Sequence, residues 1–395
     1  MKTAGYLFGN ILMMLIMGTV YAWSVFRVEV ERVFELGTLE SGLPYMTSLF
    51  FYAFSMMVTG RFLTGTNMRK IVAVGSLLIG IGWLGSAYAS NLGLLTFFYG
   101  AVIGSGVGMV YGVPVFHINH TYERKSGLFT GIVLGGFGAS PLVTAPLVSQ
   151  VIRVSGLGDA FMVMAAVSVV IMIPLSMLFK PFPLKEDHAR TDRGSFDLGL
   201  FVKVYALFLV ATAIGLMMIG LTYRIGVVDY GFEPGAVSFA MALFAVLNGL
   251  ARPVFGHLMD KIGFIKSASL STGLIVFGAL LAFLNHGESV WLYGISFGLF
   301  WFNLGAWLAI VPAAIKEYFG KVGYARRYGT AFTAYGLGAI LGTLLSGVLL
   351  DLWSDTRYVY ALILVFTILM MGFLMTFIKK RNIQKHETRM SGAGS

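Results

Sequence analysis

Long apolar stretches recur along the whole chain, and each approaches the roughly 20 residues that a helix needs to cross the hydrocarbon core of a membrane. Short polar segments separate them. The longest polar connection, residues 181–197, falls after the sixth stretch. We therefore expect an all-α integral membrane protein whose helices form two bundles of six. The twelve predicted membrane-spanning helices lie near residues 5–26, 44–64, 70–90, 93–117, 127–152, 158–180, 203–226, 236–258, 264–284, 289–314, 328–350 and 357–379.

Two short motifs repeat across the long connection in the same order. A basic pair opens the fifth helix at Arg124 and the eleventh at Arg326. A glycine ends the second helix at Gly60 and the eighth at Gly256. Chance similarity of short loops is the alternative, but order and position favour an internal duplication, the architecture of many secondary transporters. We predict pseudo-symmetric N-terminal and C-terminal bundles over 1–180 and 203–380, a linker over 181–202 and a tail over 381–395.

The composition supports a membrane protein and excludes several other classes. Of the 395 residues, 57% are hydrophobic and only 12% are charged, against about 25% charged in an ordinary soluble domain. The chain has no cysteine, which excludes a disulfide-rich secreted protein, a thiolate metal site and a cysteine nucleophile. Glycines at 100, 104, 108 and 112 predict a stripe for close helix packing rather than a nucleotide-binding loop.

The net charge of +10 is unevenly placed along the chain. Alternate connections that include both termini and the linker hold 22 of the 28 Lys and Arg residues, and the other connections hold five. Loops rich in Lys and Arg stay in the cytoplasm, so we expect both termini there. The basic excess is then a signal of membrane topology, and nucleic-acid binding has no other support.

The remaining basic residue, Arg252, falls inside a predicted helix. A guanidinium at that depth costs about 2.5–3.5 kcal/mol on insertion scales, so a compensating interaction is expected. One interpretation is an arginine whose head reaches the membrane surface. The other is a fixed positive charge in a central cavity that binds a carboxylate through two parallel hydrogen bonds. Asn248 lies one turn earlier on the same face and is expected to orient the guanidinium or to contact the substrate.

The segment from Gly256 to Gly263 resembles the loop signature of the major facilitator superfamily, in which an acid follows four residues after a glycine. We expect a tight turn in which Asp260 accepts hydrogen bonds from a helix N-terminus or pairs with a base, so that Asp260 and Gly256 act in gating. The first-half copy has Thr64 in place of the acid, so any charge lock there is expected to be weaker.

Four further segments, spread over both halves, are Gly18 to Phe26, Gly104 to Pro114, Glu123 to Gly131 and Asn248 to Arg252. Together they resemble the oxalate/formate antiporter family, a prokaryotic group related to the monocarboxylate transporters of animals. The resemblance implies a prokaryotic cell membrane, transport of a small carboxylate, and Arg252 as the residue that holds it.

Departures from the family pattern bear on the coupling and on the substrate. Asn248 stands where the animal transporters commonly have an aspartate linked to proton coupling, which leaves Asp229 and His117 as candidate proton-binding residues; for Asp229 the alternative is an ordinary loop acid. Tyr335 stands where oxalate-type members resemble one another in having a lysine. Because a dianion asks for two compensating cations, one intramembrane arginine favours a monoanion of lactate, pyruvate, formate or acetate size.

Polar and aromatic residues on other predicted helices are candidates to line the substrate site beside Arg252 and Asn248. Hydroxyls and an amide can hydrogen-bond a small acid, and aromatic rings can give it a compact wall. Packing within the bundle is the alternative for each aromatic residue. The candidates are Tyr21, Tyr111, Asn303, Trp307 and Tyr335.

The predicted function is therefore a secondary active transporter that moves a small monocarboxylate by alternating access, coupled to a proton. The alternatives are an anion exchanger of oxalate/formate type and, more remotely, a membrane-embedded enzyme or sensor on a transporter fold. No catalytic constellation supports an enzyme, and His117 and His120 lack a third metal ligand nearby. We expect no metal and no cofactor, and a monomer whose partners are the carboxylate, a proton and membrane lipid.

Overall fold

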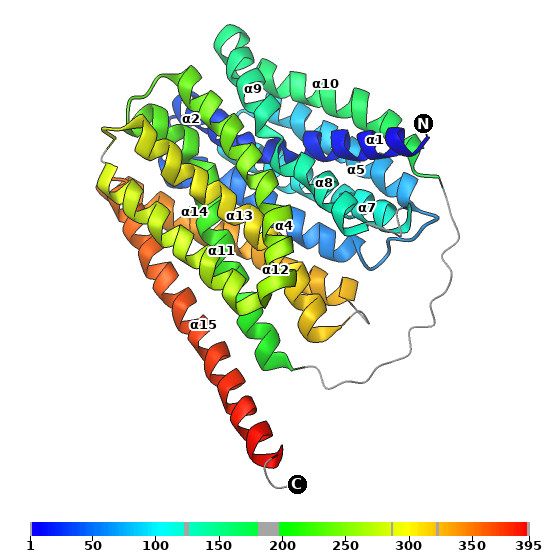
Figure 1. Cartoon of the computed structure of the whole chain (residues 1–395). Coiled ribbons are helices and arrows are strands. Elements are labelled where there is room, and N and C mark those ends of the chain that lie inside the picture. The colour runs from blue at the N-terminus through cyan, green and yellow to red at the C-terminus, as the bar shows by residue number, and fades with distance from the viewer. Residues whose placement is uncertain (1, 122–125, 181–196, 286, 321–323, 393–395) are drawn as a thin grey trace.

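The computed structural model describes residues 2–121, 126–180, 197–285, 287–320 and 324–392, and this part of the chain is helical, with no strand. The basic residue Arg124 and positions 181–196 of the predicted linker lie outside the described residues. The first-half elements (Figure 1) are α1 (Lys2–Met17), η1 (Gly18–Ala22), α2 (Trp23–Phe34), α3 (Thr38–Ser41), α4 (Leu43–Thr59), α5 (Met68–Ala87), α6 (Leu92–Leu95), η2 (Thr96–Ile103), α7 (Gly104–Thr121), α8 (Ser126–Gly138), α9 (Pro141–Ser155), α10 (Leu157–Leu175) and η3 (Ser176–Leu178). The second-half elements are α11 (Leu198–Arg224), η4 (Ile225–Asp229), α12 (Pro234–Asn285), α13 (Val290–Phe319), α14 (Tyr324–Trp353) and α15 (Arg357–Gly392).

The helices account for the twelve predicted membrane crossings. Within the described ranges, ten helical segments are long and apolar enough to cross a membrane. One of them, α12, is 52 residues long, and the left-handed backbone of Gly263 (φ 74°, ψ 176°) divides it into two crossings. The 17-residue α4 supplies one more. The predicted all-helical membrane fold is thus confirmed. The sequence was able to predict it because the length of each apolar stretch is a local property of the sequence.

The ends of two predicted elements are wrong. The first crossing does not end near residue 26: after the short 3-10 segment η1 it continues through α2 to Phe34. Arg27, which the sequence placed in a connection, therefore lies within a helix. The twelfth predicted helix also ends later than residue 379, because α15 remains helical to Gly392.

The fifth crossing is broken in its middle. Helix α8 ends at Gly138, and α9 begins at Pro141. Proline has no backbone N–H to continue the hydrogen-bonding ladder, so the carbonyl of Phe137 accepts instead from Ser140 N at 3.3 Å. The first crossing packs against this break, because a Cβ added to Gly18 would lie 2.2 Å from the Phe137 carbonyl oxygen. Two interrupted helices therefore cross at one point in the first half.

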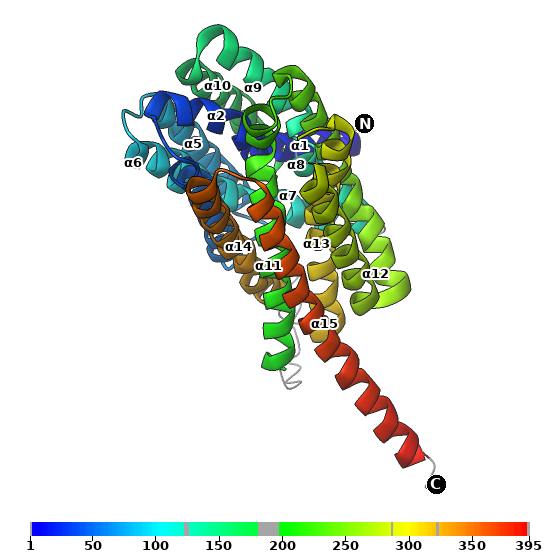
Figure 2. The same ribbon diagram turned by 90° about the vertical axis from the view of Figure 1, so that its left-hand side faces the viewer.

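Close packing along the predicted glycine stripe is confirmed. A Cβ added to Gly104 or Gly108 would lie 2.3 Å from the carbonyl oxygen of Ser48 or Tyr52, both on α4. Helices α4 and α7 therefore approach at distances that only small residues permit. Figure 2 shows the second-half helices α11 to α15 beside the first-half helices, and the halves meet where α4 packs on α14, α8 and α9 on α12, and α2 on α11.

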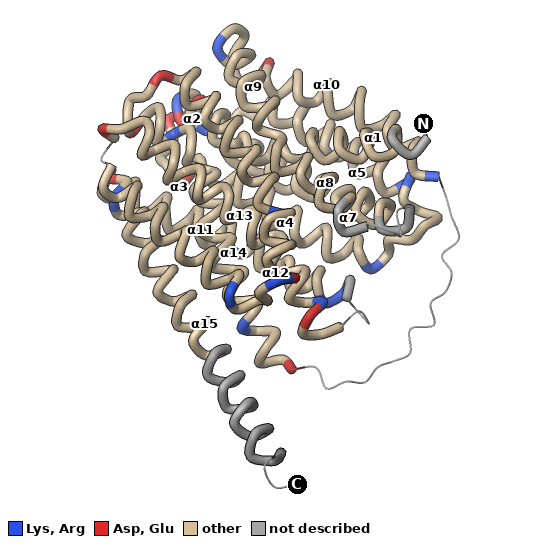
Figure 3. Tube along the Cα trace, viewed as in Figure 1, with Lys and Arg blue, Asp and Glu red and all other residues tan. Residues whose placement is uncertain are grey.

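The bundle has two ends, which we call the linker end and the distal end. The end of α10 and the start of α11, between which residues 181–196 lie, mark the linker end, and α3, which Asp351 contacts, lies at the distal end (Figures 1 and 3). Figure 3 shows most charged residues gathered toward these two ends. Few charged residues lie between the two ends, and each of these needs a group that compensates its charge inside the membrane.

Candidate functional site

Arg252 lies on α12 with its side chain only 4% exposed. Its Nη1 donates to the carbonyl oxygen of Leu134 on α8 at 2.5 Å, and its Nη2 donates to Asn248 Oδ1 at 3.5 Å. Its Nε is buried without an acceptor. No ion pair joins Arg252 to a carboxylate in the described part of the chain. The guanidinium is thus buried between the two halves rather than at the membrane surface, and its hydrogen-bond partners are neutral.

The break in the fifth crossing explains how α8 compensates this charge. Leu134 lies in the last turn of α8, where the backbone dipoles place partial negative charge. Gly138, at the end of that turn, allows the close approach, since a Cβ there would lie 2.4 Å from Asn248 Oδ1. The end of α8 therefore faces Arg252 across the boundary between the halves.

Asn248 orients the guanidinium from its own helix. It is fully buried, and its Nδ2 donates to the carbonyl oxygen of Trp301 on α13 at 2.7 Å. This bond directs Oδ1 toward Arg252, one turn further along α12. The predicted pairing of Asn248 with Arg252 on one face is present in the structure.

Three predicted tyrosines lie beside the same end of α8. The hydroxyl groups of Tyr21 and Tyr335 are 2.8 Å apart and join the first half to the second. The ring centroids of Tyr21 and Tyr111 lie 5.2 Å and 5.3 Å from that of Phe137, which is one turn beyond Leu134. We call Tyr21, Tyr111, Asn248, Arg252 and Tyr335 the central group.

Asn303 and Trp307 do not contact the central group in the described contacts. The amide of Asn303 is held by Ser271 Oγ, which donates to its Oδ1 at 2.6 Å, and by the Leu299 carbonyl oxygen, which accepts from its Nδ2 at 2.9 Å. Ser271 belongs to the second crossing of α12, so this amide serves packing within the second half. Trp307 is fully buried, and its Nε1 has no acceptor among the residues described.

The two candidate proton-binding residues lie at opposite ends of the bundle. Both carboxylate oxygens of Asp229 accept from Arg224 Nη1, at 2.8 Å and 2.9 Å, near the distal end. His117 Nδ1 lies 3.3 Å from Asn10 Nδ2, and the His117 ring contacts Phe179 near the linker end. The contacts described for these two residues do not include the central group.

The predicted gating turn is wrong in its position. Residues 256–262 continue the helix, and only Gly263 leaves helical geometry. Asp260 is exposed at the end of this helix and has no ion pair within the described ranges. A left-handed glycine is sufficient to turn the chain here, because glycine adopts positive φ without steric cost.

Arg27 is a buried charge that the sequence analysis missed. It is 1% exposed on α2, and its Nε lies 3.3 Å from Glu31 Oε1. The spacing of four residues between Arg27 and Glu31 is a signal for a helical ion pair that was available in the sequence. Arg27 is thus buried within a helix as Arg252 is, but Arg27 has a carboxylate partner. The charge of Arg252 has only neutral partners among the described residues.

Comparison with known proteins agrees with this architecture. The model of the Major Facilitator Superfamily matches residues 197–393. An oxalate:formate antiporter of Oxalobacter formigenes is 25% identical over 346 residues, covering 84% of this chain and 81% of that protein. Monocarboxylate transporter 11 of Mus musculus is 28% identical over 314 residues, covering 74% and 68%.

A solved structure shows the same fold. The crystal structure of a bacterial homologue of the human lysosomal transporter Spinster, in an inward-facing and occupied conformation, superposes with a TM-score of 0.72. It covers 96% of this chain and 97% of that one at 12% identity, so the likeness concerns the fold alone. The helical architecture, the family match and the transporter relatives agree: residues 197–393 match the major facilitator superfamily, and the protein is a multi-pass membrane transporter rather than an enzyme.

Proposed function

We propose that this transporter carries a small monocarboxylate anion across the membrane by alternating access, with Arg252 as the ligand of the carboxylate. The observation that supports this most strongly is a buried guanidinium whose partners are a backbone carbonyl and an amide, with one N–H unused. An anion supplies the compensating charge that these neutral groups do not.

The position of Arg252 supports a coupling between binding and closure. Arg252 belongs to the second half, whereas Leu134, Tyr21 and Tyr111 belong to the first. An anion between them contacts both halves at once only while the halves are close. Its binding free energy therefore differs between open and occluded states, which is what alternating access requires.

The aromatic side chains favour a small substrate. The ring centroids of Tyr21 and Tyr111 each stand just over 5 Å from that of Phe137, and the ring centroid of Tyr52 stands 5.8 Å from it. Such packed rings form a compact wall, and the tyrosine hydroxyl groups offer hydrogen bonds to a second oxygen of the acid. We propose an acid of lactate, pyruvate, formate or acetate size.

For the coupling we propose symport with a proton, and exchange of anions is a second candidate. The neutral partners of Arg252 favour exchange. A carrier without substrate would have to reorient while the charge of Arg252 is compensated only by the dipoles of the Leu134 carbonyl and the Asn248 amide. One relative, from Oxalobacter formigenes, is by name an antiporter of oxalate and formate. We further propose that the linker end faces the cytoplasm of a prokaryotic cell, in accord with its share of Lys and Arg.

Uptake into proteoliposomes tests the substrate and the coupling together. Labelled lactate, pyruvate, formate and oxalate are offered with and without an inward proton gradient, and with and without internal anion. Accumulation driven by the gradient supports symport, and uptake only against internal anion supports exchange.

Variants at Arg252 test the site itself. Arg252→Lys keeps the charge but loses the planar pair of donors, and we expect the KM for the carboxylate to rise about 10- to 100-fold, the value of one charge-assisted hydrogen bond. Arg252→Ala removes the cation and is expected to abolish uptake. Lys203→Ala, at the linker end of α11, removes a cation outside the central group and is the matched control. Unimpaired uptake by both Arg252 variants contradicts the assignment.

A further inference from the structure

Arg252 lies far from both ends of the bundle. The first crossing of α12 runs from Pro234 to the turn at Gly263, so at 1.5 Å per residue Arg252 lies about 27 Å along the helix from one end and about 16 Å from the other. Figure 3 shows most charged residues nearer to the two ends of the bundle. A charge at the depth of Arg252 lies in the region across which the membrane potential falls.

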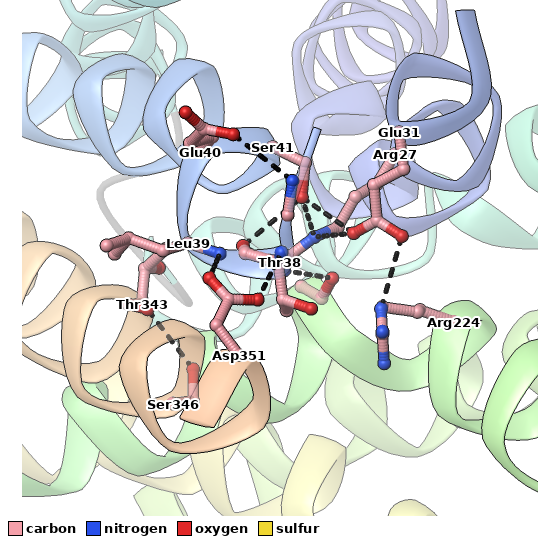
Figure 4. A network of polar contacts seen from close by, with 12 residues as sticks. Arg27, Glu31, Thr38, Leu39, Glu40, Ser41, Arg224, Thr343, Ser346 and Asp351 are labelled. Atoms are coloured by element: carbon pink, nitrogen blue, oxygen red, sulfur yellow. Dashed lines mark hydrogen bonds and ion pairs between the residues drawn. The ribbon is translucent and has the colours of Figure 1, made fainter. Parts of the chain in front are cut away.

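Arg27, the other arginine that is buried in the described residues, belongs to a set whose charges compensate one another. Its Nε lies 3.3 Å from Glu31 Oε1, and Arg224 Nε lies 3.2 Å from Glu31 Oε2 (Figure 4). Arg224 Nη1 also donates to both carboxylate oxygens of Asp229, at 2.8 Å and 2.9 Å. Two arginines thus face two carboxylates near the distal end, and the set as a whole is neutral.

Arg252 keeps its unit charge, because its two described hydrogen bonds go to neutral groups. They are the carbonyl oxygen of Leu134 and the amide oxygen of Asn248. The dipoles of these groups stabilise the guanidinium but leave its net charge unchanged. Of the two buried arginines in the part of the chain that the structure describes, only Arg252 is therefore uncompensated when no substrate is bound.

A bound monocarboxylate cancels this charge, so the net charge at the centre differs between the two forms of the transporter. It is +1 when the site is empty and zero when one anion lies against Arg252. The guanidinium stands at the boundary between the halves, since it contacts Leu134 of the first half from a helix of the second. In alternating access this boundary is open first to one solution and then to the other. A charge at the boundary therefore moves through part of the membrane potential each time the access changes.

We propose that the reorientation of the empty transporter is a voltage-dependent step, because it carries the charge of Arg252 through part of the membrane potential. The inference rests on the proposed function, in which Arg252 binds the carboxylate. Reorientation with the anion bound moves no net charge at this site. A proton bound elsewhere would add its charge to the loaded step and leave the empty step unchanged. The membrane potential then acts on net transport, which includes the empty step, and has little effect on exchange of anions, which does not.

Net efflux and exchange, measured in the same proteoliposomes, test this inference. Vesicles are loaded with a labelled monocarboxylate and diluted into buffer that contains either no substrate or a saturating concentration of the unlabelled acid. Net efflux requires the empty transporter to return from outside to inside, whereas external acid replaces this return by the loaded step. A potassium gradient with valinomycin makes the interior about 100 mV negative, which attracts the returning positive charge whichever way the protein is inserted.

We expect this potential to accelerate net efflux about sevenfold, the value for one elementary charge when half of the potential acts on the rate. Exchange is expected to change by less than about twofold, because it bypasses the empty step. Faster net efflux with nearly constant exchange supports the inference. Equal effects of the potential on net efflux and on exchange overturn the inference while leaving the proposed function intact. Absence of both fluxes with every acid offered overturns the proposed function and this inference with it.

Variants assign the voltage dependence to Arg252. Asn248→Asp puts a carboxylate where the amide Oδ1 now lies 3.5 Å from Arg252 Nη2, so the empty site becomes neutral. We expect the effect of the potential on its residual net efflux to fall below about twofold. Arg252→Lys keeps the charge, and its slower net efflux is expected to keep the sevenfold ratio. Lys203→Gln, the matched control, removes a cation near the linker end and is expected to behave as the parent. An undiminished ratio in Asn248→Asp, or a lost ratio in Lys203→Gln, overturns the assignment to Arg252.

Discussion

Gly138→Ala is expected to damage carboxylate binding by moving the groups that hold Arg252. The added Cβ would lie 2.4 Å from Asn248 Oδ1 and 3.3 Å from Arg252 Nη2. Because non-bonded atoms pack at about 3.5 Å or more, either the Asn248 amide or the two helices must move by about 1 Å. Overpacking of this kind costs about 1–3 kcal/mol, and we expect the affinity for the carboxylate to fall about 10- to 100-fold.

The assay is the KM for uptake of a labelled monocarboxylate in proteoliposomes, with thermal unfolding of the same samples as a measure of folding. Gly135→Ala is the matched control, since it adds the same methyl group to the same helix, one turn earlier, where nothing lies within 4 Å of the new Cβ. We expect this control to keep the parental KM. Equal KM values for Gly138→Ala, Gly135→Ala and the parent would refute the role of the α8 end in positioning Arg252.

Three further predictions concern stability and pH. Tyr335→Phe removes the hydrogen bond to Tyr21, and we expect the free energy of unfolding to fall by about 0.5–1.5 kcal/mol, measured by thermal unfolding; an unchanged midpoint would count against this bond. Gly263→Ala forces a side chain into a left-handed backbone (φ 74°) at a cost of about 1–2 kcal/mol, and an equal midpoint in the same assay would contradict it. Two backbone N–H groups at the start of α12 lower the pKa of Glu233 below its ordinary 4.5, so its contribution to stability is present above that pH and is lost as pH falls through the lowered pKa. The midpoint difference between the parent and Glu233→Gln is expected to vanish in acid, and a difference independent of pH would disprove this linkage.

The sequence was sufficient to predict the crossings and Arg252, since both depend on local contrast. The length of an apolar stretch can be read directly from the sequence, and so can the position of an arginine within it. Asn248 followed from helical spacing to Arg252. The partners of Arg252 could not be predicted, because the Leu134 carbonyl is a backbone group of α8 that reaches Arg252 only through the packing of α8 on α12.

The contacts of other residues could not be predicted because their partners are distant in the sequence. Asn303 has the chemistry of a substrate ligand, yet Ser271 occupies its amide through a contact that only the packing of α12 on α13 determines. Arg27 lies in a stretch rich in charge, which suggested a connection between helices. Arg27 is buried because α3 and α11 pack against it, and this packing could not be predicted from the neighbouring residues in the sequence.

The buried position of Arg27 also bears on how the first crossing enters the membrane during synthesis. Its acceptor on α11, the carbonyl of Gly220, follows 193 positions later, which ribosomes traverse in about 10–40 s. During that interval the first crossing has to insert into the bilayer. Of the groups that hydrogen-bond Arg27 in the structure, only Glu31, Ser41 and Thr38 are then available. Glu31, one turn away, is already present when Arg27 leaves the ribosome. We therefore expect the Glu31 carboxylate, which pairs with Arg224 in the complete protein, to compensate the charge of Arg27 during membrane insertion, before the second half of the protein is synthesised.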